Sequence, residues 1–234
     1  MPPAFSAEVW RFIKTSVRTA AGTLLRGRAI RQYLKTHQFR GLHIGAGTHI
    51  LSGWLNTNYP KFTGGSILLD ASRPFPFSDA QFDLVFSEHQ IEHLSYQEGK
   101  AMLGECFRVM KPGGILRLAT PDLDRLAGLF TQQKTAGQQQ YITWMVGRYY
   151  PDSGLCNECL AINNAFRNWG HQFLYDFATI RDSLLRAGFS DIRRAAPGVS
   201  SVRELQGIDR HGDTIGSDEL NAFETLVVEA KRPE

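Results

Sequence analysis

The chain has 234 residues, of which 42% are hydrophobic and 21% are charged. These fractions are typical of a globular protein and exclude a disordered or fibrous chain. The length predicts one domain with an appendage, and three cysteines, an odd number, argue against a secreted disulfide scaffold. Apolar runs are far shorter than the ~20 residues that cross a bilayer, and Arg11, Lys14 and Arg18 interrupt the N-terminal ones. We therefore expect a soluble, cytoplasmic protein without a cleaved signal peptide.

The positive charge is concentrated at the N-terminus. Residues 1–40 carry eight Lys and Arg and one acid, whereas the remainder carries 18 Lys and Arg and 22 Asp and Glu. Apolar residues recur in this segment at helical spacing, namely Val9, Ile13, Val17, Ala20 and Leu24. We expect a basic amphipathic arm over residues 1–37. It would suit an anionic partner, namely nucleic acid, a phospholipid surface or a phosphorylated substrate, although a solvated helix face explains the same pattern.

From residue 39 onward, short apolar runs alternate with helical stretches. Expected strands cover residues 39–44, 54–58, 66–69, 82–86 and 115–119, and a helix covers residues 97–110. Lys111-Pro112-Gly113-Gly114 should end that helix, because proline and paired glycines cannot continue it. Nearly continuous apolar strands between helices indicate a parallel sheet covered on both faces.

The alternation of strands and helices is interrupted at residues 121–170, where glutamine clusters and large aromatic residues predict a partly helical cap insertion. The domain that contains this insertion is expected to span residues 38–234. A helix then begins at Asp176 or Thr179 and ends at Gly188, with Phe189 packing back on it. Residues 190–195 and 223–230 should form two closing strands.

A Gly-x-Gly turn follows the first predicted strand. Gly45 and Gly47 stand where an α/β sheet binds a nucleotide-like ligand, because glycine lets the backbone approach the ligand closely. A dinucleotide fingerprint would place a third glycine at Ile50, so an NAD or FAD site is disfavoured.

Several segments, taken together, carry a family resemblance: residues 42–47, 53–56, 75–78 with 82–83, 92–94, 107–114 and 120–123. As a set they resemble class I S-adenosylmethionine-dependent methyltransferases, most closely the type-11-like group. The likeness covers about residues 38–125 and 171–195. It implies a doubly wound, Rossmann-like α/β sheet of about seven strands, mostly parallel, with a reversed strand near the C-terminus.

The resemblance also implies S-adenosyl-L-methionine as cofactor. Gly45, Ala46 and Gly47 would cradle its methionine part, and Asn58 stands where the family has the ribose-binding acid. Asp70 would meet the adenine amino group with Ala71 as its backbone neighbour, and Ser87, Glu88 and His89 would line the floor beside the sulfonium. In addition, His43 replaces an acid that many members carry two residues before the first glycine.

The function we expect is methyl transfer to an oxygen or nitrogen of a small-molecule or glycan-linked acceptor. Positioning can supply most of the acceleration, since the sulfonium is already activated. A base helps a hydroxyl acceptor, and imidazole titrates near neutral pH, so His171 and His89 are the candidate catalytic residues. A structural role for either histidine explains the same residues.

Other interpretations of the sequence are less favoured. The run from His89 to His93 matches the HxxEH pattern of inverted zinc peptidases, but it begins at a strand end rather than on a helix. Cys156 and Cys159 form a lone CxxC, so we expect no metal site, although the nearby His171 keeps one conceivable. A non-catalytic nucleotide-binding scaffold on the same fold is one alternative. A nucleic-acid methyltransferase is another, but we do not expect a nucleic-acid partner, because no Asn-Pro-Pro-Tyr-type motif follows the fourth strand.

Overall fold

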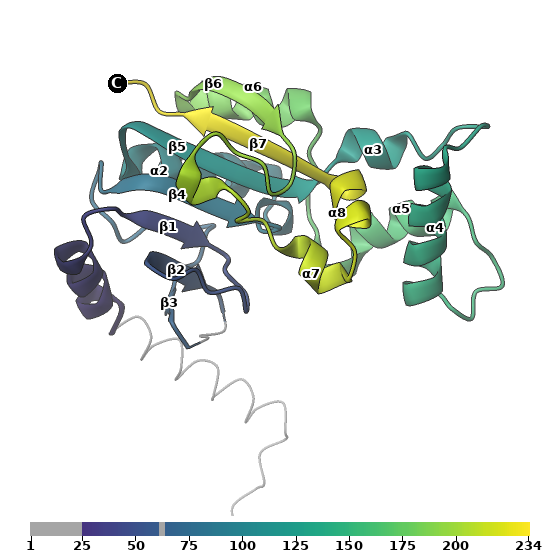
Figure 1. Ribbon diagram of the computed structural model, residues 1–234, viewed down its shortest axis with the longest axis horizontal. Coiled ribbons are helices and arrows are strands. Elements are labelled where there is room, and N and C mark those ends of the chain that lie inside the picture. Colours follow the sequence, from purple (N-terminus) through teal and green to yellow (C-terminus); the bar gives the residue numbers. More distant parts are fainter. Residues whose placement is uncertain (1–24, 61–63) are drawn as a thin grey trace, which may run out of the picture.

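A seven-stranded sheet forms the centre of the molecule (Figure 1). A computed structural model describes residues 25–60 and 64–234. The strand order is β3-β2-β1-β4-β5-β7-β6, and β7 runs antiparallel to both β5 and β6 while the other pairs are parallel. The strands are β1 (Gly41–Ile44), β2 (Trp54–Asn58), β3 (Ser66–Leu68), β4 (Phe82–Glu88), β5 (Met110–Pro121), β6 (Ser190–Ala195) and β7 (Thr225–Lys231). The expected α/β sheet with a reversed strand near the C-terminus is confirmed.

The two faces of the sheet are covered differently. Helices α2 (Tyr96–Val109) and α6 (Phe177–Ala187) pack on one face, where Leu103 and Leu184 join Val85 in the main core. On the other face a long loop containing η3 (Arg203–Leu205) packs Leu205 and Ile208 against Leu84 and Phe86 of β4. Alternate residues of β4 therefore enter two separate cores, as the two-residue period of a strand requires.

The local sequence explains where α2 begins and how β5 starts. Ser95 and Glu98 form a capping box that satisfies free backbone N–H groups at the first turn of α2. The Lys-Pro-Gly-Gly segment does end the helix, but it then forms an irregularity inside β5, because Met110 pairs with Phe82 and Ile115 already pairs with Leu84. Gly113 adopts φ +77° there, which is a conformation that glycine adopts without strain.

Helix α6 ends as the sequence predicts. Asp176 caps its N-terminus by accepting a hydrogen bond from Thr179 N, and Gly188 at φ +103° closes its C-terminus. Phe189 then packs edge-on against Phe107 of α2, with 5.2 Å between ring centroids.

A helical cap stands beyond the end of β5 and the start of β7 (Figure 1). Residues 121–170 supply α3 (Leu123–Ala127), α4 (Ala136–Tyr149), α5 (Glu158–Arg167) and η2 (Asn168–Gly170). Two further helices from the C-terminal region, α7 (His211–Ile215) and α8 (Asp218–Glu224), complete it. The cap has its own apolar core, in which Tyr141, Ile142, Met145, Ala161, Ile215 and Leu220 are buried.

Only part of the expected basic arm lies within the described residues. Residues 25–36 are helical, and Ile30 and Tyr33 are buried in the main core. The Tyr33 hydroxyl bonds to the backbone of Gly41 and to the carbonyl of Gly53. This part of the arm therefore packs as part of the domain, while residues 1–24 lie outside the described residues.

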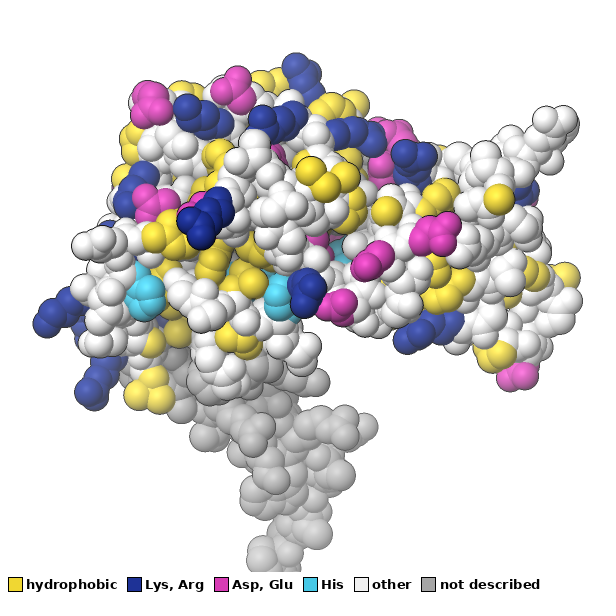
Figure 2. All heavy atoms as spheres, viewed as in Figure 1, with side chains coloured by type: hydrophobic (Ala, Val, Ile, Leu, Met, Phe, Trp, Pro, Cys, Tyr) yellow, Lys and Arg dark blue, Asp and Glu magenta, His cyan; other side chains and the backbone are white. Residues whose placement is uncertain are grey.

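Lys and Arg side chains follow the upper edge of the molecule, with Asp and Glu side chains among them (Figure 2). Arg193 lies 3.0 Å from Glu229, and Arg194 lies 3.0 Å from both Asp122 and Asp124. No helix among the described residues is long and apolar enough to cross a membrane.

Candidate active site

The carboxyl ends of β1, β3 and β4 open into a cavity of about 270 Å³, which we call the strand-end cavity. Parallel strands present their following loops at one edge of the sheet, so residues far apart in sequence meet there. The cavity is lined by Ile44, Gly45, Tyr59, Leu69, Asp70, Ala71, Ser72, Gln90, His93, Leu94, Glu98 and Gln172. Three predicted cofactor residues, Gly45, Asp70 and Ala71, are among them.

The glycine turn after β1 needs its glycines. Gly45 and Gly47 adopt φ +73° and +54°, where an L side chain is strained. A Cβ on Gly45 would also lie 2.5 Å from Oε1 of Gln90, whereas a Cβ on Gly47 would meet nothing within 4 Å. Gln90 therefore leaves no room for a side chain at Gly45, whereas there is free space beside Gly47.

Asn58 holds this turn in place. Its Oδ1 accepts from Gly47 N, and its Nδ2 donates to Gly47 O, both at 2.8 Å. The amide satisfies a donor and an acceptor of the same backbone residue, which a carboxylate could not do. The residue at the predicted ribose position therefore braces the loop that carries Gly47.

Asp70 is fixed with its carboxylate at the cavity. Its Oδ1 accepts from the backbone N and the hydroxyl of Ser72, at 3.0 and 2.6 Å. Beside it, Leu69 and Ala71 are buried and supply an apolar wall. A carboxylate next to an apolar wall suits a flat ring that carries an amino group.

Six other predicted cofactor residues do not line the strand-end cavity, namely Ala46, Gly47, Asn58, Ser87, Glu88 and His89. Ser87 is buried inside β4, and its hydroxyl has no hydrogen-bond partner among the described residues. Glu88 accepts hydrogen bonds from the backbone N–H groups of Arg210 and His211 at 2.9–3.1 Å, so it holds the start of α7. Glu88 therefore stabilises the first residues of α7, a helix of the cap.

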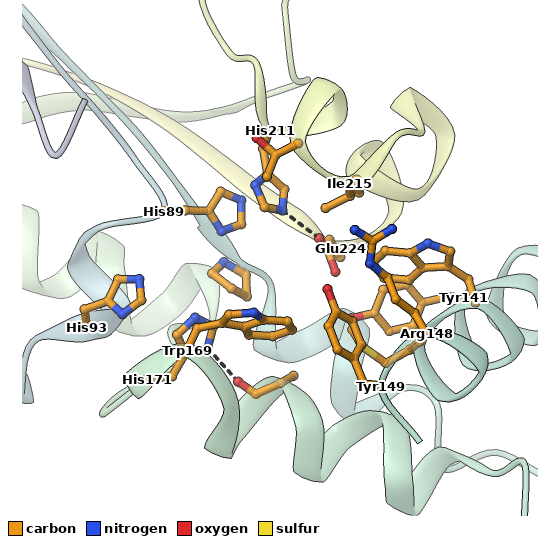
Figure 3. A pocket seen from close by; sticks show the side chains of 15 residues that line it. His89, His93, Tyr141, Arg148, Tyr149, Trp169, His171, His211, Ile215 and Glu224 are labelled. Atoms are coloured by element: carbon orange, nitrogen blue, oxygen red, sulfur yellow. Dashed lines mark hydrogen bonds and ion pairs between the residues drawn. The ribbon is translucent and has the colours of Figure 1, made fainter. Parts of the chain in front are cut away.

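A second cavity, of about 380 Å³, lies between the sheet and the cap, and we call it the cap cavity. Figure 3 shows His89, His93 and His171 on one side of it and Tyr141, Arg148 and Tyr149 on the other. Its further lining residues are Pro121, Trp144, Met145, Ala165, Trp169, His211, Thr214, Ile215 and Glu224. Both predicted catalytic histidines, His171 and His89, therefore face one cavity.

His89 is held between charged and aromatic neighbours. Its Nδ1 lies 3.1 Å from Oε1 of Glu92, and its ring stacks on His211 with 3.6 Å between centroids. Burial alone would lower the pKa of His89, but the interaction with the Glu92 carboxylate outweighs burial and raises it. His89 also adopts φ +46°, an uncommon conformation for a non-glycine residue that occurs most often at functional sites.

His171 presents a defined tautomer. Its Nδ1 lies 2.6 Å from the carbonyl oxygen of Ala165. A carbonyl can only accept, so Nδ1 carries the proton and Nε2 is the unprotonated nitrogen of the neutral ring. Burial lowers the pKa of His171, which favours this neutral form.

His93 lines both cavities. It ends η1 (Ile91–His93), the short turn after β4. Backbone hydrogen bonds from Gln172 and Phe173 to the Glu92 carbonyl, at 2.7 and 3.2 Å, bring residues 171–173 beside this turn. His93 therefore lies between the strand-end cavity and the cap cavity.

A comparison with protein-family models gives one match, to a methyltransferase domain, over residues 60–118. This segment runs from the end of β2 into β5 and includes Asp70, His89 and His93. The strand order with an antiparallel β7 agrees with that family. Residues 60–118 therefore match a methyltransferase domain, in agreement with the resemblance to class I S-adenosylmethionine-dependent methyltransferases.

Solved structures similar to this methyltransferase are distant in sequence. Phosphoethanolamine N-methyltransferase 2 of Haemonchus contortus, solved with phosphomonomethylethanolamine and S-adenosylhomocysteine, has 13% identity and a TM-score of 0.48, over 85% of this chain and 49% of that one. This chain thus spans about half the length of that enzyme. A SAM-dependent methyltransferase from Archaeoglobus fulgidus has 17% identity and a TM-score of 0.46, over 92% and 94% of the two chains. No curated protein matches this chain.

The residues of the strand-end cavity fit the adenosine part of the cofactor that the family uses. The apolar wall of Leu69 and Ala71 suits a purine ring, and the fixed Asp70 carboxylate can accept from its amino group. The open side of Gly47 leaves room for a ligand next to the backbone.

Sequence reasoning missed part of this site. His93, Gln90 and Gln172 line the strand-end cavity although none was predicted to do so. Of these three residues, only His93 could have been found from the sequence, because the Glu92-His93 pair is among the segments that resemble the family. The cap aromatics were interpreted as core, and Tyr141 is indeed buried, but the half-exposed Trp169 lines the cap cavity.

Proposed function

We propose that this methyltransferase binds S-adenosylmethionine in the strand-end cavity and transfers its methyl group to an oxygen or nitrogen of a small-molecule or glycan-linked acceptor in the cap cavity. The observation that supports this proposal is the shared residue His93, since donor and acceptor must approach within about 3–3.5 Å for the transfer. The cofactor supplies a methyl group already activated on sulfur.

The walls of the cap cavity favour a ring-shaped acceptor. Trp169 is 48% exposed and packs edge-on against Tyr149, with 5.0 Å between ring centroids. It also adopts φ +57°, so the chain holds a large aromatic side chain at the surface in a strained conformation. Such a ring offers a flat apolar face to a sugar or a planar small molecule.

His89 and His171 are the groups that we propose to prepare the acceptor. Both face the cap cavity, and Nε2 of His171 has a lone pair that no carbonyl occupies. Glu92 pairs with His89 from the buried side, with 3.1 Å between Oε1 and Nδ1.

A labelled-methyl assay tests the acceptor class. Purified protein and radiolabelled S-adenosylmethionine are incubated with separate small-molecule, glycan-conjugate, RNA and protein fractions. We expect label in the small-molecule or glycan fraction. Trp169→Ala should lower the rate at subsaturating acceptor about tenfold, or ~1.4 kcal/mol, while Phe130→Ala, an exposed cap residue outside the cavity, should not. Label in RNA or protein would contradict this acceptor class, and cofactor binding without transfer to any fraction would support the scaffold alternative.

A further inference from the structure

The HxxEH run forms a cluster with a distant histidine. Glu92, His93 and His171 each offer one ligand atom, and these atoms lie within 4.8 Å of one another. From the sequence, a zinc site at this run was disfavoured because the run begins at a strand end rather than on a helix. The structure places Glu92 and His93 on η1 and brings His171 to them through the backbone bonds between Glu92 and residues 172–173.

Glu92 carries an unsatisfied oxygen. Its side chain is fully buried, and Oε2 accepts from the Thr120 hydroxyl at 3.1 Å. Oε1 lies 3.1 Å from His89 Nδ1, but the contact does not have hydrogen-bond geometry, and Oε1 has no other donor among the described residues. A buried carboxylate oxygen without an aligned donor is costly, and a bound cation would satisfy it.

His93 and His171 are also suited to bind a cation. Because the Ala165 carbonyl holds the Nδ1 proton of His171, Nε2 is left to coordinate, and a backbone carbonyl in this role is a common outer partner of metal-binding histidines. The rings of His93 and His171 meet edge-on with 4.9 Å between centroids. The side chain of His93 has no hydrogen bond within the described part of the chain.

We propose that Glu92, His93 and His171 bind a divalent first-row transition-metal ion, such as zinc. Two imidazoles and one carboxylate are a donor set for such ions, and three protein ligands leave positions open for a substrate. Metal–ligand bonds of about 2.0–2.2 Å place ligand atoms no more than ~4.4 Å apart, so binding would draw these side chains together by a few tenths of an ångström.

The position of the cluster suggests how an ion would be used. Since His93 faces both cavities, an open coordination position lies where acceptor and donor meet. An acceptor hydroxyl bound to the ion would lose its proton to His89, and its oxygen would form a bond to the methyl carbon. The carbon–sulfur bond would break with its electron pair going to sulfur, and His171 would serve as a ligand. This use of the ion rests on the proposed function, whereas the existence of the metal-binding site does not. If the ion binds the acceptor in this way, the acceptor is an oxygen nucleophile.

Metal titration of the chelator-treated full chain tests the site. Co²⁺ is followed by its visible absorption and Zn²⁺ by calorimetry, in a Cys156→Ser/Cys159→Ser background that removes the exposed thiols. We expect one ion per chain. His93→Ala and His171→Ala should each weaken binding at least ~100-fold, since losing even an outer partner of a ligand costs about 10–100-fold. His211→Ala, from the same cavity, should bind like the parent.

Absence of binding at millimolar Co²⁺ and Zn²⁺, or unchanged binding by the His93 and His171 variants, would overturn the site. Stabilisation by S-adenosylhomocysteine is measured on the same samples, so a failed metal site is distinguished from a failed cofactor site. Circular dichroism of each variant checks that it is folded.

Discussion

His43, at a position where the family resemblance implies an acid, lies at the bottom of the glycine turn with 1% of its surface exposed. Its Nδ1 donates to Asn56 Oδ1 at 3.1 Å, and the Asn56 amide is fixed in turn by the carbonyls of Leu51 and Trp54. Burial lowers the pKa of His43 to about 4, so the folded protein holds a neutral imidazole. The substitution therefore exchanges a family carboxylate for a buried hydrogen-bonded group behind the turn.

This burial predicts a pH-dependent stability. The His43 imidazole takes up a proton near pH 6.5 in the unfolded chain, but only near pH 4 in the folded chain. The contribution of His43 is thus fully present above pH ~6.5 and is lost as the pH falls toward 4, by up to about 3 kcal/mol. Urea unfolding between pH 4 and 7 should show His43→Gln losing less stability over this window than wild type. If the unfolding free energies of the two proteins changed equally with pH, a lowered pKa of His43 in the folded protein would be contradicted.

Individual side-chain roles were the hardest part to predict from the sequence. The family resemblance implied that Asn58, Ser87 and Glu88 bind the cofactor. In the structure Asn58 braces Gly47, Ser87 is buried inside the sheet, and Glu88 binds the backbone of α7. Their roles depend on partners 11 to 123 residues away, which no local pattern specifies.

At the scale of elements, one buried arginine joins two strands to the loop that leads to the cap. Arg117 of β5 is fully buried and donates to Glu229 of β7 at 2.7 Å and to Asp209. It also donates to the carbonyls of Val199 and Ala196 at 3.0 and 3.1 Å. The loop that covers one face of the sheet is fixed by these bonds before it enters α7.

Removing this arginine should be costly. Arg117→Met would leave the carboxylates of Asp209 and Glu229 buried with too few partners, and breaking a buried ion pair costs about 3–5 kcal/mol. Arg193→Met removes a 55% exposed partner of the same Glu229 and should cost less than about 1 kcal/mol. Urea unfolding of both variants measures the contrast. Similar losses would mean that the network is not what anchors the loop.

The strands and the long helices were predictable because their patterns are local. Short, largely apolar runs predicted most of the strands, and Asp176 and Gly188 marked the ends of α6. Helices α7 and α8 were missed, since five and seven residues are too short for a periodic apolar pattern. The start of β5 was missed because Lys111–Gly114 continues the strand through an irregularity.

On the scale of the whole molecule, the site arises where the sheet and the cap meet. The strand-end cavity belongs to the sheet, the cap cavity needs α4, α5, α7 and η2 as well, and His93 lies in both. The sequence predicted that a cap exists but not that its aromatic residues and four histidines share one cavity. That arrangement depends on packing between segments more than 100 residues apart.

Thermal unfolding directly tests the proposal that the strand-end cavity binds the methyl donor. Binding at about a hundred times the dissociation constant adds ~2.7 kcal/mol of stability, which for a chain of this length raises the melting temperature by about 5–10 °C. We therefore expect saturating S-adenosylhomocysteine to give such a shift and NAD to give none. Asp70→Ala should weaken binding at least several-fold, while Asp152→Ala, an exposed acid outside the cavity, should match wild type. No shift at millimolar S-adenosylhomocysteine, or an equal affinity of the Asp70→Ala variant, would contradict the account.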